Sequence, residues 1–229
     1  MMQPGKYFNA IWKQFGADCL TELYHTNEFT LAVAVILSAQ ATDKHVNTVT
    51  PGLFAVADTP AKMTNLGIAE LKEFIKSISF FNNKAKNIIA LSEILTGSGD
   101  CYYENSAEQS CSNWRFPAKY HSRDALMMLP GIGQKTANVV SNILWGAPNI
   151  GVDTHLFRLS HRFGWADGAD DTPEKVESKL LARIPKKYHA IANHAMVMHG
   201  RYICKALRPD CGNCPVALLC DSKDKKLEA

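Results

Sequence analysis

Four cysteines close together near the end of the sequence constrain this chain more than any other feature. They lie in the segment CKALRPDCGNCPVALLC, at Cys204, Cys211, Cys214 and Cys220 of 229 residues. The opening sequence, MMQPGKYFNAIWKQFG, lacks the apolar core of a signal peptide, and no stretch has membrane-spanning length without polar interruption. We therefore expect a soluble, intracellular protein. Because the intracellular thiol pool keeps ordinary cysteines reduced, clustered thiols indicate a metal site rather than a disulfide scaffold.

Two kinds of metal centre are compatible with the spacing Cys-x6-Cys-x2-Cys-x5-Cys. Zinc fingers usually present two short Cys pairs, and this segment contains only one. An iron–sulfur cluster is larger and accepts ligands spread more evenly around a loop, so the spacing favours a cluster and leaves zinc as the alternative. Gly212 and Pro215 suit a backbone that wraps closely around such a centre. The other cysteines, Cys19, Cys101 and Cys111, lack metal-binding spacing, and we expect Cys19 to be a small core residue.

Apolar residues recur at helical spacing along almost the whole chain, whereas the alternation typical of half-buried strands is scarce. We therefore predict an all-α fold. Thr59 before Pro60, and Ser122 before a short apolar repeat, are residue types that begin helices. The expected helices cover residues 28–43, 59–78, 83–95, 122–129, 134–145, 154–163, 172–184 and 186–204.

The segment from Thr96 to Ser122 departs from the helical pattern. It is rich in Gly, Ser and Asn and has no sustained periodicity, which predicts a long surface loop. Loops of this length are usually either functional or disordered, and both interpretations stay open.

The net charge of +3 is too small to indicate a partner, but the charges are unevenly distributed. No acidic residue lies between Glu177 and Asp210, so this region is electropositive, either as a phosphate-facing surface or as a solvated helix face. Its basic residues are Lys179, Arg183, Lys186, Lys187, Arg201, Lys205 and Arg208.

The segment LPGIGQKTANVV, residues 129–140, joins two expected helices through a glycine turn. Glycines let the backbone approach a ligand closely, and amides at a helix start bind anions, although the turn alone is also compatible with a simple connection. Lys135 stands in the first turn of the second helix, where the helix dipole opposes a cation and favours the neutral, nucleophilic amine, although the position alone is also compatible with an ordinary lysine that has no catalytic role. Asp153, in VDTH, precedes another helix and either caps it or supplies a carboxylate for charge stabilisation and proton transfer.

Taken in order, these motifs resemble the endonuclease III branch of the helix–hairpin–helix DNA glycosylases. LSAQATDKHVN at 37–47 and IKSISFFNNKAKNI at 75–88 match that branch, and the glycine turn, VDTH and the cysteine spacing follow in the family order. The resemblance covers nearly the whole chain apart from the long loop.

The resemblance implies a bifunctional DNA glycosylase and AP lyase. Such an enzyme excises oxidised pyrimidines from double-stranded DNA and cuts the strand 3′ to the abasic site by β-elimination. Lys135 matches the family's nucleophile, which forms a Schiff base with C1′, and Asp153 matches its catalytic aspartate. The four clustered cysteines match the ligands of a [4Fe–4S] cluster, which would hold a loop bearing Lys205 and Arg208 near phosphates without taking part in bond breaking.

The resemblance also implies where DNA is bound. Such enzymes extrude the damaged nucleotide, and Gln40 matches the residue that fills the vacated space from one side. Phe80, Phe81 and Asn82 match the wedge from the other side, with the two phenylalanines replacing the family's usual leucine and tyrosine. The residues expected at the DNA are Gln40, Phe80, Phe81, Asn82, Leu129, Gly131, Gly133, Thr136, Lys186, Lys187 and Lys205.

The family fold has two helical lobes with a DNA-binding cleft between them. We expect residues 23–135 to form a six-helix barrel ending in the helix–hairpin–helix, and residues 1–22 with 136–229 to form the cluster domain. A monomer in the prokaryotic cytoplasm, associated with the nucleoid, is expected. The long loop is either a tolerated insertion or, if it folds toward DNA, a source of stacking contacts from Tyr102, Tyr103 and Trp114.

Two rival functions remain. A monofunctional relative such as the adenine glycosylase lacks a lysine at the position of Lys135 and carries a further domain after the cluster, whereas this sequence has Lys135 and ends nine residues after Cys220. A non-catalytic iron–sulfur module would not need both Lys135 and Asp153. Both comparisons favour the bifunctional enzyme.

Overall fold

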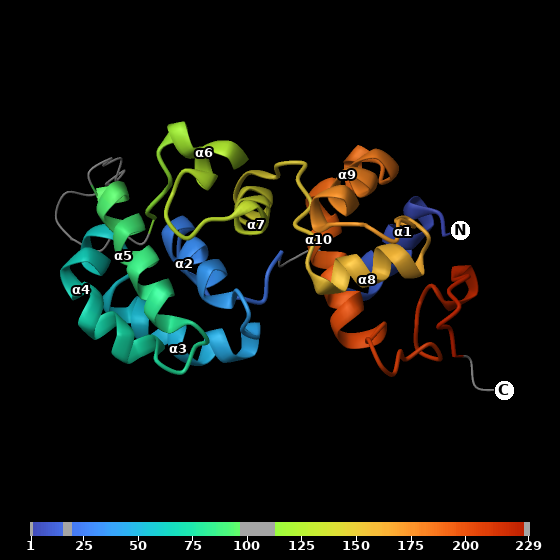
Figure 1. Ribbon diagram of the computed structural model, residues 1–229, viewed down its shortest axis with the longest axis horizontal. Coiled ribbons are helices and arrows are strands. Elements are labelled where there is room, and N and C mark those ends of the chain that lie inside the picture. The colour runs from blue at the N-terminus through green and yellow to red at the C-terminus, as the bar shows by residue number, and fades with distance from the viewer. Residues whose placement is uncertain (1, 16–19, 97–112, 227–229) are drawn as a thin grey trace. The chain divides into compact units, whose positions relative to one another are not determined.

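The computed structural model describes residues 2–15, 20–96 and 113–226 (Figure 1). Throughout these residues the chain forms helices joined by turns and loops, without a strand, which confirms the predicted all-α class. None of the helices in these ranges is long and apolar enough to cross a membrane. The predictions made for Cys19, Cys101, Cys111, Tyr102 and Tyr103 lie outside the described residues.

Contacts divide the chain into two compact units. We name them the central unit, Glu22–Trp145, and the terminal unit, Met1–Thr21 with Gly146–Ala229. Helix α7, Gln134–Trp145, belongs to the central unit because it packs against α2, Glu28–Ser38, and α6, Arg123–Met127. The boundary near residue 135 that the sequence suggested would separate α7 from these packing partners.

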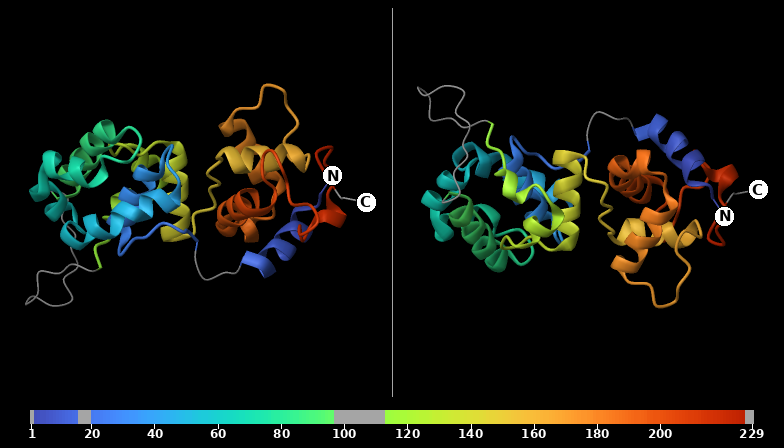
Figure 2. Two further views of the ribbon diagram at one scale, coloured as in Figure 1. Left: turned by 90° about the horizontal axis from the view of Figure 1, so that it is seen from below. Right: turned by 90° about the horizontal axis from the view of Figure 1, so that it is seen from above.

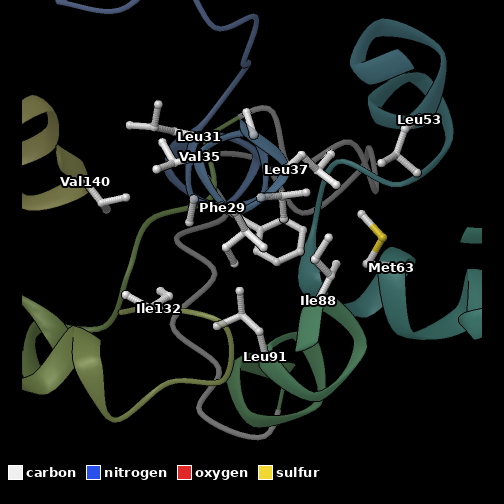
Figure 3. Packing of buried hydrophobic residues seen from close by; sticks show 14 of the residues in the cluster. Phe29, Leu31, Val35, Leu37, Leu53, Met63, Ile88, Leu91, Ile132 and Val140 are labelled. Atoms are coloured by element: carbon white, nitrogen blue, oxygen red, sulfur yellow. The ribbon is translucent and has the colours of Figure 1, made fainter. Parts of the chain in front are cut away.

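Helix α2 forms the middle of the central unit. Its residues from Phe29 to Leu37 are all buried, as expected for a helix that is apolar on most sides. Figure 3 shows side chains of neighbouring segments, among them Met63, Ile88 and Ile132, gathered around those of α2. The surrounding helices are α3 (Asp43–Val56), α4 (Pro60–Ile75), α5 (Phe81–Thr96), α6 and α7, with a short 3-10 turn η1 (Ala118–Tyr120) before α6.

Side-chain caps explain where several of these helices begin. Thr59 caps α4 and Ser122 caps α6, which confirms both predictions. Asn27 caps α2 through a reciprocal pair of bonds that the sequence analysis did not identify. The Asn27 carboxamide oxygen accepts from the Thr30 N–H at 2.9 Å, and the Thr30 hydroxyl accepts from the Asn27 N–H at 2.9 Å.

The end of the segment expected to be a surface loop belongs to the core. Trp114 is only 3% exposed, and its ring contacts Phe29 edge-on at 5.6 Å and Phe116 at 5.1 Å between centroids. The Phe116 N–H donates to the Glu28 carboxylate at 2.7 Å, and the Trp114 carbonyl accepts from the Glu28 N–H at 3.3 Å. The suggestion that Trp114 stacks on DNA is therefore wrong, because burial against α2 removes its ring from the surface.

The terminal unit has its own core, which is built around aromatic side chains. Tyr7 and Phe8 of α1, Pro4–Phe15, pack with Trp165, whose indole N–H donates to the Met2 carbonyl at 2.7 Å. Both views in Figure 2 place α1 beside the C-terminal segments of this unit. Its remaining elements are α8 (Thr154–Arg162), α9 (Pro173–Arg183), η2 (Lys186–Tyr188), α10 (His189–Met198), η3 (His199–Ile203) and η4 (Ala217–Leu219).

The helix expected over residues 186–204 consists of three pieces. A 3-10 turn over Lys186–Tyr188 leads into α10, and α10 continues as a π-helical turn over His199–Ile203. This wider turn ends immediately before Cys204, the first residue of the cysteine segment. Such single π turns inside helices are frequent at functional sites.

Candidate functional site

The glycine turn between α6 and α7 contains two glycines with different surroundings, Gly131 and Gly133. The fold requires glycine at position 131 but not at position 133. Gly131 has φ +77°, and a Cβ there would lie 2.9 Å from the Asn87 Cβ on α5. Gly133, which directly precedes α7, lies outside the left-handed region, and a Cβ there would have no heavy atom within 4 Å. Gly131 therefore serves packing, whereas the open space at Gly133 leaves the start of α7 accessible to a ligand.

The other predicted residues of the turn differ in their exposure. Leu129 is only 4% exposed and belongs to the core of the central unit, so its side chain is not available to a ligand. Thr136 is half-buried, and Lys135 is exposed in the first turn of α7. Within the described part of the chain no side chain or carbonyl group pairs with the Lys135 ammonium. The turn thus presents one available amine beside a helix N-terminus.

Asp153 performs the capping role that the sequence allowed. One carboxylate oxygen, Oδ1, accepts from the His155 N–H at 2.8 Å and from the Leu156 N–H at 2.9 Å at the start of α8. The side chain is half-exposed, and its second oxygen takes no part in the cap. Capping holds the carboxylate in one orientation and leaves one oxygen for another partner. Asp153 lies in the terminal unit, and Lys135 lies in the central unit.

Two of the residues predicted to fill the space left by an extruded nucleotide have an unusual backbone. Among the described residues, the non-glycine residues with positive φ are Gln40, at +56°, and Phe80, at +59°. Both are exposed, Phe80 to 64%, and they lie in the α2–α3 and α4–α5 connections of the central unit. Left-handed backbone costs an ordinary residue about 1–2 kcal/mol and clusters at functional sites. Asn82 is exposed, whereas Phe81 is half-buried against the core.

The four clustered cysteines line one pocket in the terminal unit. Its empty volume, including solvent at the open mouth, is about 300 Å³, and its other walls include Phe163, His199 and Ile203. Burial, followed by the charges of the other three cysteines, raises the pKa of Cys214 to about 11. Burial likewise raises the pKa of Cys204. In the described ranges no three His, Cys, Asp or Glu side chains are arranged to hold a single metal ion.

Two arginines of α8 hold the first part of the cysteine segment, and the sequence analysis did not identify either. Arg158 donates through Nη2 to the Gly200 carbonyl at 2.8 Å and to the Cys204 carbonyl at 3.1 Å. Arg162 donates through Nη1 to the Cys204 Sγ at 3.3 Å and to the Lys205 carbonyl at 2.7 Å. Their spacing of four residues places both on one face of α8, which was the available sequence signal. The helix that Asp153 caps is therefore also the support of this segment.

Two buried side chains, Tyr7 and His199, form a chain of hydrogen bonds that ends at the Cys214 thiol. The Tyr7 hydroxyl lies 3.0 Å from His199 Nδ1, and His199 Nε2 lies 3.4 Å from the Cys214 Sγ. Burial and the nearby Arg158 charge lower the pKa of His199 to about 4, so the imidazole is neutral near pH 7. If Tyr7 donates to Nδ1, the proton on Nε2 is directed at the sulfur. Neutral donors of this kind stabilise a thiolate without adding a charge.

The basic stretch divides into residues that serve the fold and residues that are exposed. Lys179 pairs with Asp171 at 2.8 Å and with Asp167 at 3.2 Å, and Arg183 Nη1 donates to the Gly164 carbonyl at 2.6 Å. Lys179 and Arg183 thus bond α9 to the α8–α9 connection and stabilise it. The predicted phosphate contacts Lys186, Lys187 and Lys205 are all exposed.

Comparison with known proteins places these features in a family. Residues 33–186 match the HhH-GPD family, described as HhH-GPD superfamily base excision DNA repair protein. The chain is 51% identical over 201 residues to endonuclease III of Rickettsia conorii (strain ATCC VR-613 / Malish 7), covering 88% of this chain and 87% of that protein. It is 44% identical over 205 residues to endonuclease III of Escherichia coli (strain K12), covering 90% and 89%.

Solved structures are similar over almost the full length. A trapped endonuclease III–DNA covalent intermediate has a TM-score of 0.77 and 39% identity, covering 96% of this chain and 97% of that one. A non-covalent endonuclease III–DNA complex has the same TM-score and identity, covering 96% of each chain. A thermostable thymine-DNA glycosylase, at a TM-score of 0.74 and 18% identity over 94% of this chain and 93% of that one, shares the fold.

Proposed function

Since this chain belongs to the HhH-GPD superfamily of base excision DNA repair proteins, in its endonuclease III branch, we propose that it is a DNA glycosylase and AP lyase whose nucleophile is Lys135. The observation that carries the assignment is the Lys135 amine itself. It is exposed in the first turn of α7, unpaired within the described residues, and lies two residues after Gly133, whose surroundings are open. Its substrate is double-stranded DNA that contains damaged pyrimidines or abasic sites.

The proposed reaction begins with attack by the neutral Lys135 amine on C1′ of the damaged nucleotide. The bond from C1′ to the base breaks, and the base leaves with the bonding electrons and takes up a proton. Opening of the sugar ring then gives a Schiff base between C1′ and Nζ. Loss of the C2′ proton forms a C2′–C3′ double bond and expels the 3′ phosphate, which cuts the strand. Hydrolysis of the imine with water releases the enzyme.

We assign Asp153 to the charges that develop during these steps. Positive charge accumulates on the sugar as the base departs, and the amine must lose a proton after it attacks. A carboxylate stabilises the positive charge on the sugar and accepts the proton from the amine. The cap on α8 fixes Oδ1 through two backbone N–H groups, so the remaining oxygen, Oδ2, is the one that we assign to this role.

The DNA contacts are proposed from the surfaces that the structure leaves exposed. Amides at the start of α7, next to Gly133, bind a phosphate, and Lys186, Lys187 and Lys205 add charge contacts. Because the sugar carbon is unreachable inside the base stack, the damaged nucleotide must be extruded. Gln40 and Phe80 fill the vacated space. Bacterial relatives and a DNA substrate support action at the nucleoid, in the cytoplasm.

We propose that Cys204, Cys211, Cys214 and Cys220 hold a [4Fe–4S] cluster. The fit rests on four thiols that line one pocket, and thiolates are the ligands that hold such clusters. Burial and the charges of the neighbouring cysteines disfavour the Cys214 thiolate on its own, and bound iron would supply the missing positive charge. Arg162 and His199 contact two of the sulfurs. When bound, the cluster would supply cross-links that fix the loop bearing Lys205, and no step of the reaction requires it.

A strand-cleavage assay on a panel of duplexes tests the function. Each duplex carries one lesion, either a ring-saturated pyrimidine, an oxidised pyrimidine, an oxidised purine or an abasic site. We expect base release and strand cutting without alkali for the damaged pyrimidines, and cutting at the abasic site. Base release that gives nicks only after alkali would indicate a monofunctional glycosylase, and no release from any duplex would refute the assignment.

A further inference from the structure

Lys84 on α5 is a buried lysine whose amine is bonded to backbone carbonyl groups of another helix. Its side chain is only 7% exposed, and Nζ donates to the Leu37 carbonyl at 2.8 Å and to the Ala39 carbonyl at 2.6 Å. Burial lowers the pKa of Lys84, as expected for an ammonium that lacks full hydration. Because burying a charge is unfavourable unless it is well bonded, a lysine at this position needs a specific reason.

The two carbonyl groups belong to the end of α2, immediately before Gln40. The last carbonyls of a helix have no partner within it and carry the negative end of the helix dipole, so a cation is stabilised there. Ala39 is the residue that precedes the left-handed backbone of Gln40. Lys84 therefore fixes the point at which the chain turns toward Gln40.

The same residue is also bonded to the second left-handed position. The Lys84 backbone N–H donates to the Phe80 carbonyl at 3.1 Å, in the first turn of α5. A second bond ties the α4–α5 connection to α3, because His45 Nε2, on α3, lies 3.0 Å from the Ser77 hydroxyl. Backbone in a sparsely populated conformation persists only where its surroundings hold it, and Lys84 contacts both such places.

We propose that Lys84 is a positioning residue that fixes Gln40 and Phe80 relative to each other, so that both side chains can enter the space vacated by an extruded nucleotide. The inference rests on the proposed function, since it presumes that a nucleotide is extruded. Lys84 does not touch the reacting atoms. It acts through backbone carbonyls, and a small displacement of Gln40 or Phe80 would reduce the population of the extruded state.

The test compares Lys84→Met with wild type in two reactions. Methionine keeps the length and apolar stem of the side chain but cannot donate. Base release from a lesion duplex, measured in single turnover, is expected to fall by up to about 100-fold, since a misplacement of about 1 Å can cost that much. Borohydride trapping on an abasic site in single-stranded DNA is expected to stay near the wild-type yield, because that substrate has no stacked partner strand to penetrate. Fluorescence of 2-aminopurine placed opposite the lesion should report the lost extrusion directly.

Two controls separate positioning from general damage to the fold. Lys86→Met removes an exposed lysine from the same helix and should leave both reactions unchanged. In a Gln40→Ala/Phe80→Ala background, Lys84→Met should cause little further loss of base release, because the groups that it positions are gone. If Lys84→Met does not fold, as judged by circular dichroism, Lys84→Gln, which keeps a donor, goes through the same cycle.

The outcomes are distinct. Unchanged base release in Lys84→Met, or an equal additional loss in the Gln40→Ala/Phe80→Ala background, would overturn the positioning role. Equal losses in base release and in single-strand trapping would also overturn it, since they would indicate a structural lysine. If the wild-type protein neither releases base nor forms an adduct, the proposed function fails instead.

Discussion

The two glycines of the α6–α7 turn are expected to respond in opposite ways to the same substitution. Gly131→Ala places a methyl group 2.9 Å from the Cβ of Asn87, which lies in α5. The substituted residue would also have to keep φ +77°. The left-handed conformation alone costs alanine about 1–2 kcal/mol, and the overlap adds to it, so we expect a loss of about 2–3 kcal/mol in the free energy of unfolding. For a protein of this size that lowers Tm by about 4–12 °C.

Gly133→Ala is expected to leave stability unchanged or slightly raised. No heavy atom lies within 4 Å of the added Cβ, and the backbone is outside the left-handed region. Alanine also lowers the conformational entropy of the unfolded chain. This raises the free energy of unfolding by about 0.4–1 kcal/mol where the native backbone conformation suits alanine. The methyl group does, however, occupy the space through which a phosphate would approach the amides at the start of α7. Loss of one hydrogen bond to a charged group costs about 1.5–3 kcal/mol, or roughly 10- to 150-fold in Kd.

Thermal unfolding followed by circular dichroism and binding to a duplex followed by fluorescence anisotropy measure the two effects on the same samples. Gly131→Ala should lower Tm, and Gly133→Ala should raise Kd without lowering Tm. If Gly133→Ala destabilises the protein or binds DNA like wild type, the reasoning that separates a packing glycine from a ligand-facing glycine is refuted.

Three further outcomes depend on charges and thiols. The Lys179 hydrogen bond holds the pKa of Asp171 below its ordinary 3.8, so the stability that this carboxylate contributes is present above that ordinary pKa and is lost as the pH falls through the lowered value of the folded state. Asp171→Asn should therefore flatten the acid side of the stability profile measured from about pH 5 to about pH 1, and an unchanged profile would contradict this. Lys186→Ala and Lys187→Ala should each reduce the slope of log affinity against log salt by about 0.9. Lys179→Ala should leave this slope unchanged, because Asp167 and Asp171 already neutralise the Lys179 charge. If the three variants have equal slopes, the basic stretch is not the DNA-binding face. The purified protein should be yellow-brown with about four irons per chain and should lose thermal stability on chelation, whereas a colourless protein with stoichiometric zinc would reject the cluster.

Features with a local physical cause were predictable from the sequence. The all-α class follows from apolar spacing, and the caps Thr59 and Ser122 follow from residue type next to a helix start. Helix α1, Pro4–Phe15, carries the same kind of signal in Tyr7, Phe8 and Ile11, which lie at helical spacing and are all buried. These features depend on neighbours a few residues apart, and such patterns are visible without a fold.

Features that depend on distant residues were not predictable. Trp114 lies in a segment with loop-like composition, and only its packing on Phe29 explains why it is buried. In the sequence Lys179 is one of several basic residues, and only the structure shows that Asp171 pairs with it. Lys84 bonds to carbonyl groups more than forty residues away, and a carbonyl group has no residue type to recognise.

The candidate site shows the same division. The spacing of the four cysteines was enough to predict that they share one pocket, and the glycine turn was enough to place Lys135 at a helix start. The arginines of α8 that hold the cysteine segment act mainly through backbone carbonyls, so their role required coordinates. The left-handed backbone at Gln40 and Phe80 likewise has no counterpart in residue type, because glycine is the residue expected there.

Reductive trapping tests the central claim most directly. A duplex with one abasic site is incubated with the protein and borohydride, and the covalent product is digested and mapped by mass spectrometry. The account predicts one adduct, attached at Nζ of Lys135, and its loss in Lys135→Ala while the thermal stability is retained. An adduct attached to a different amine, or an undiminished yield from Lys135→Ala, would contradict it.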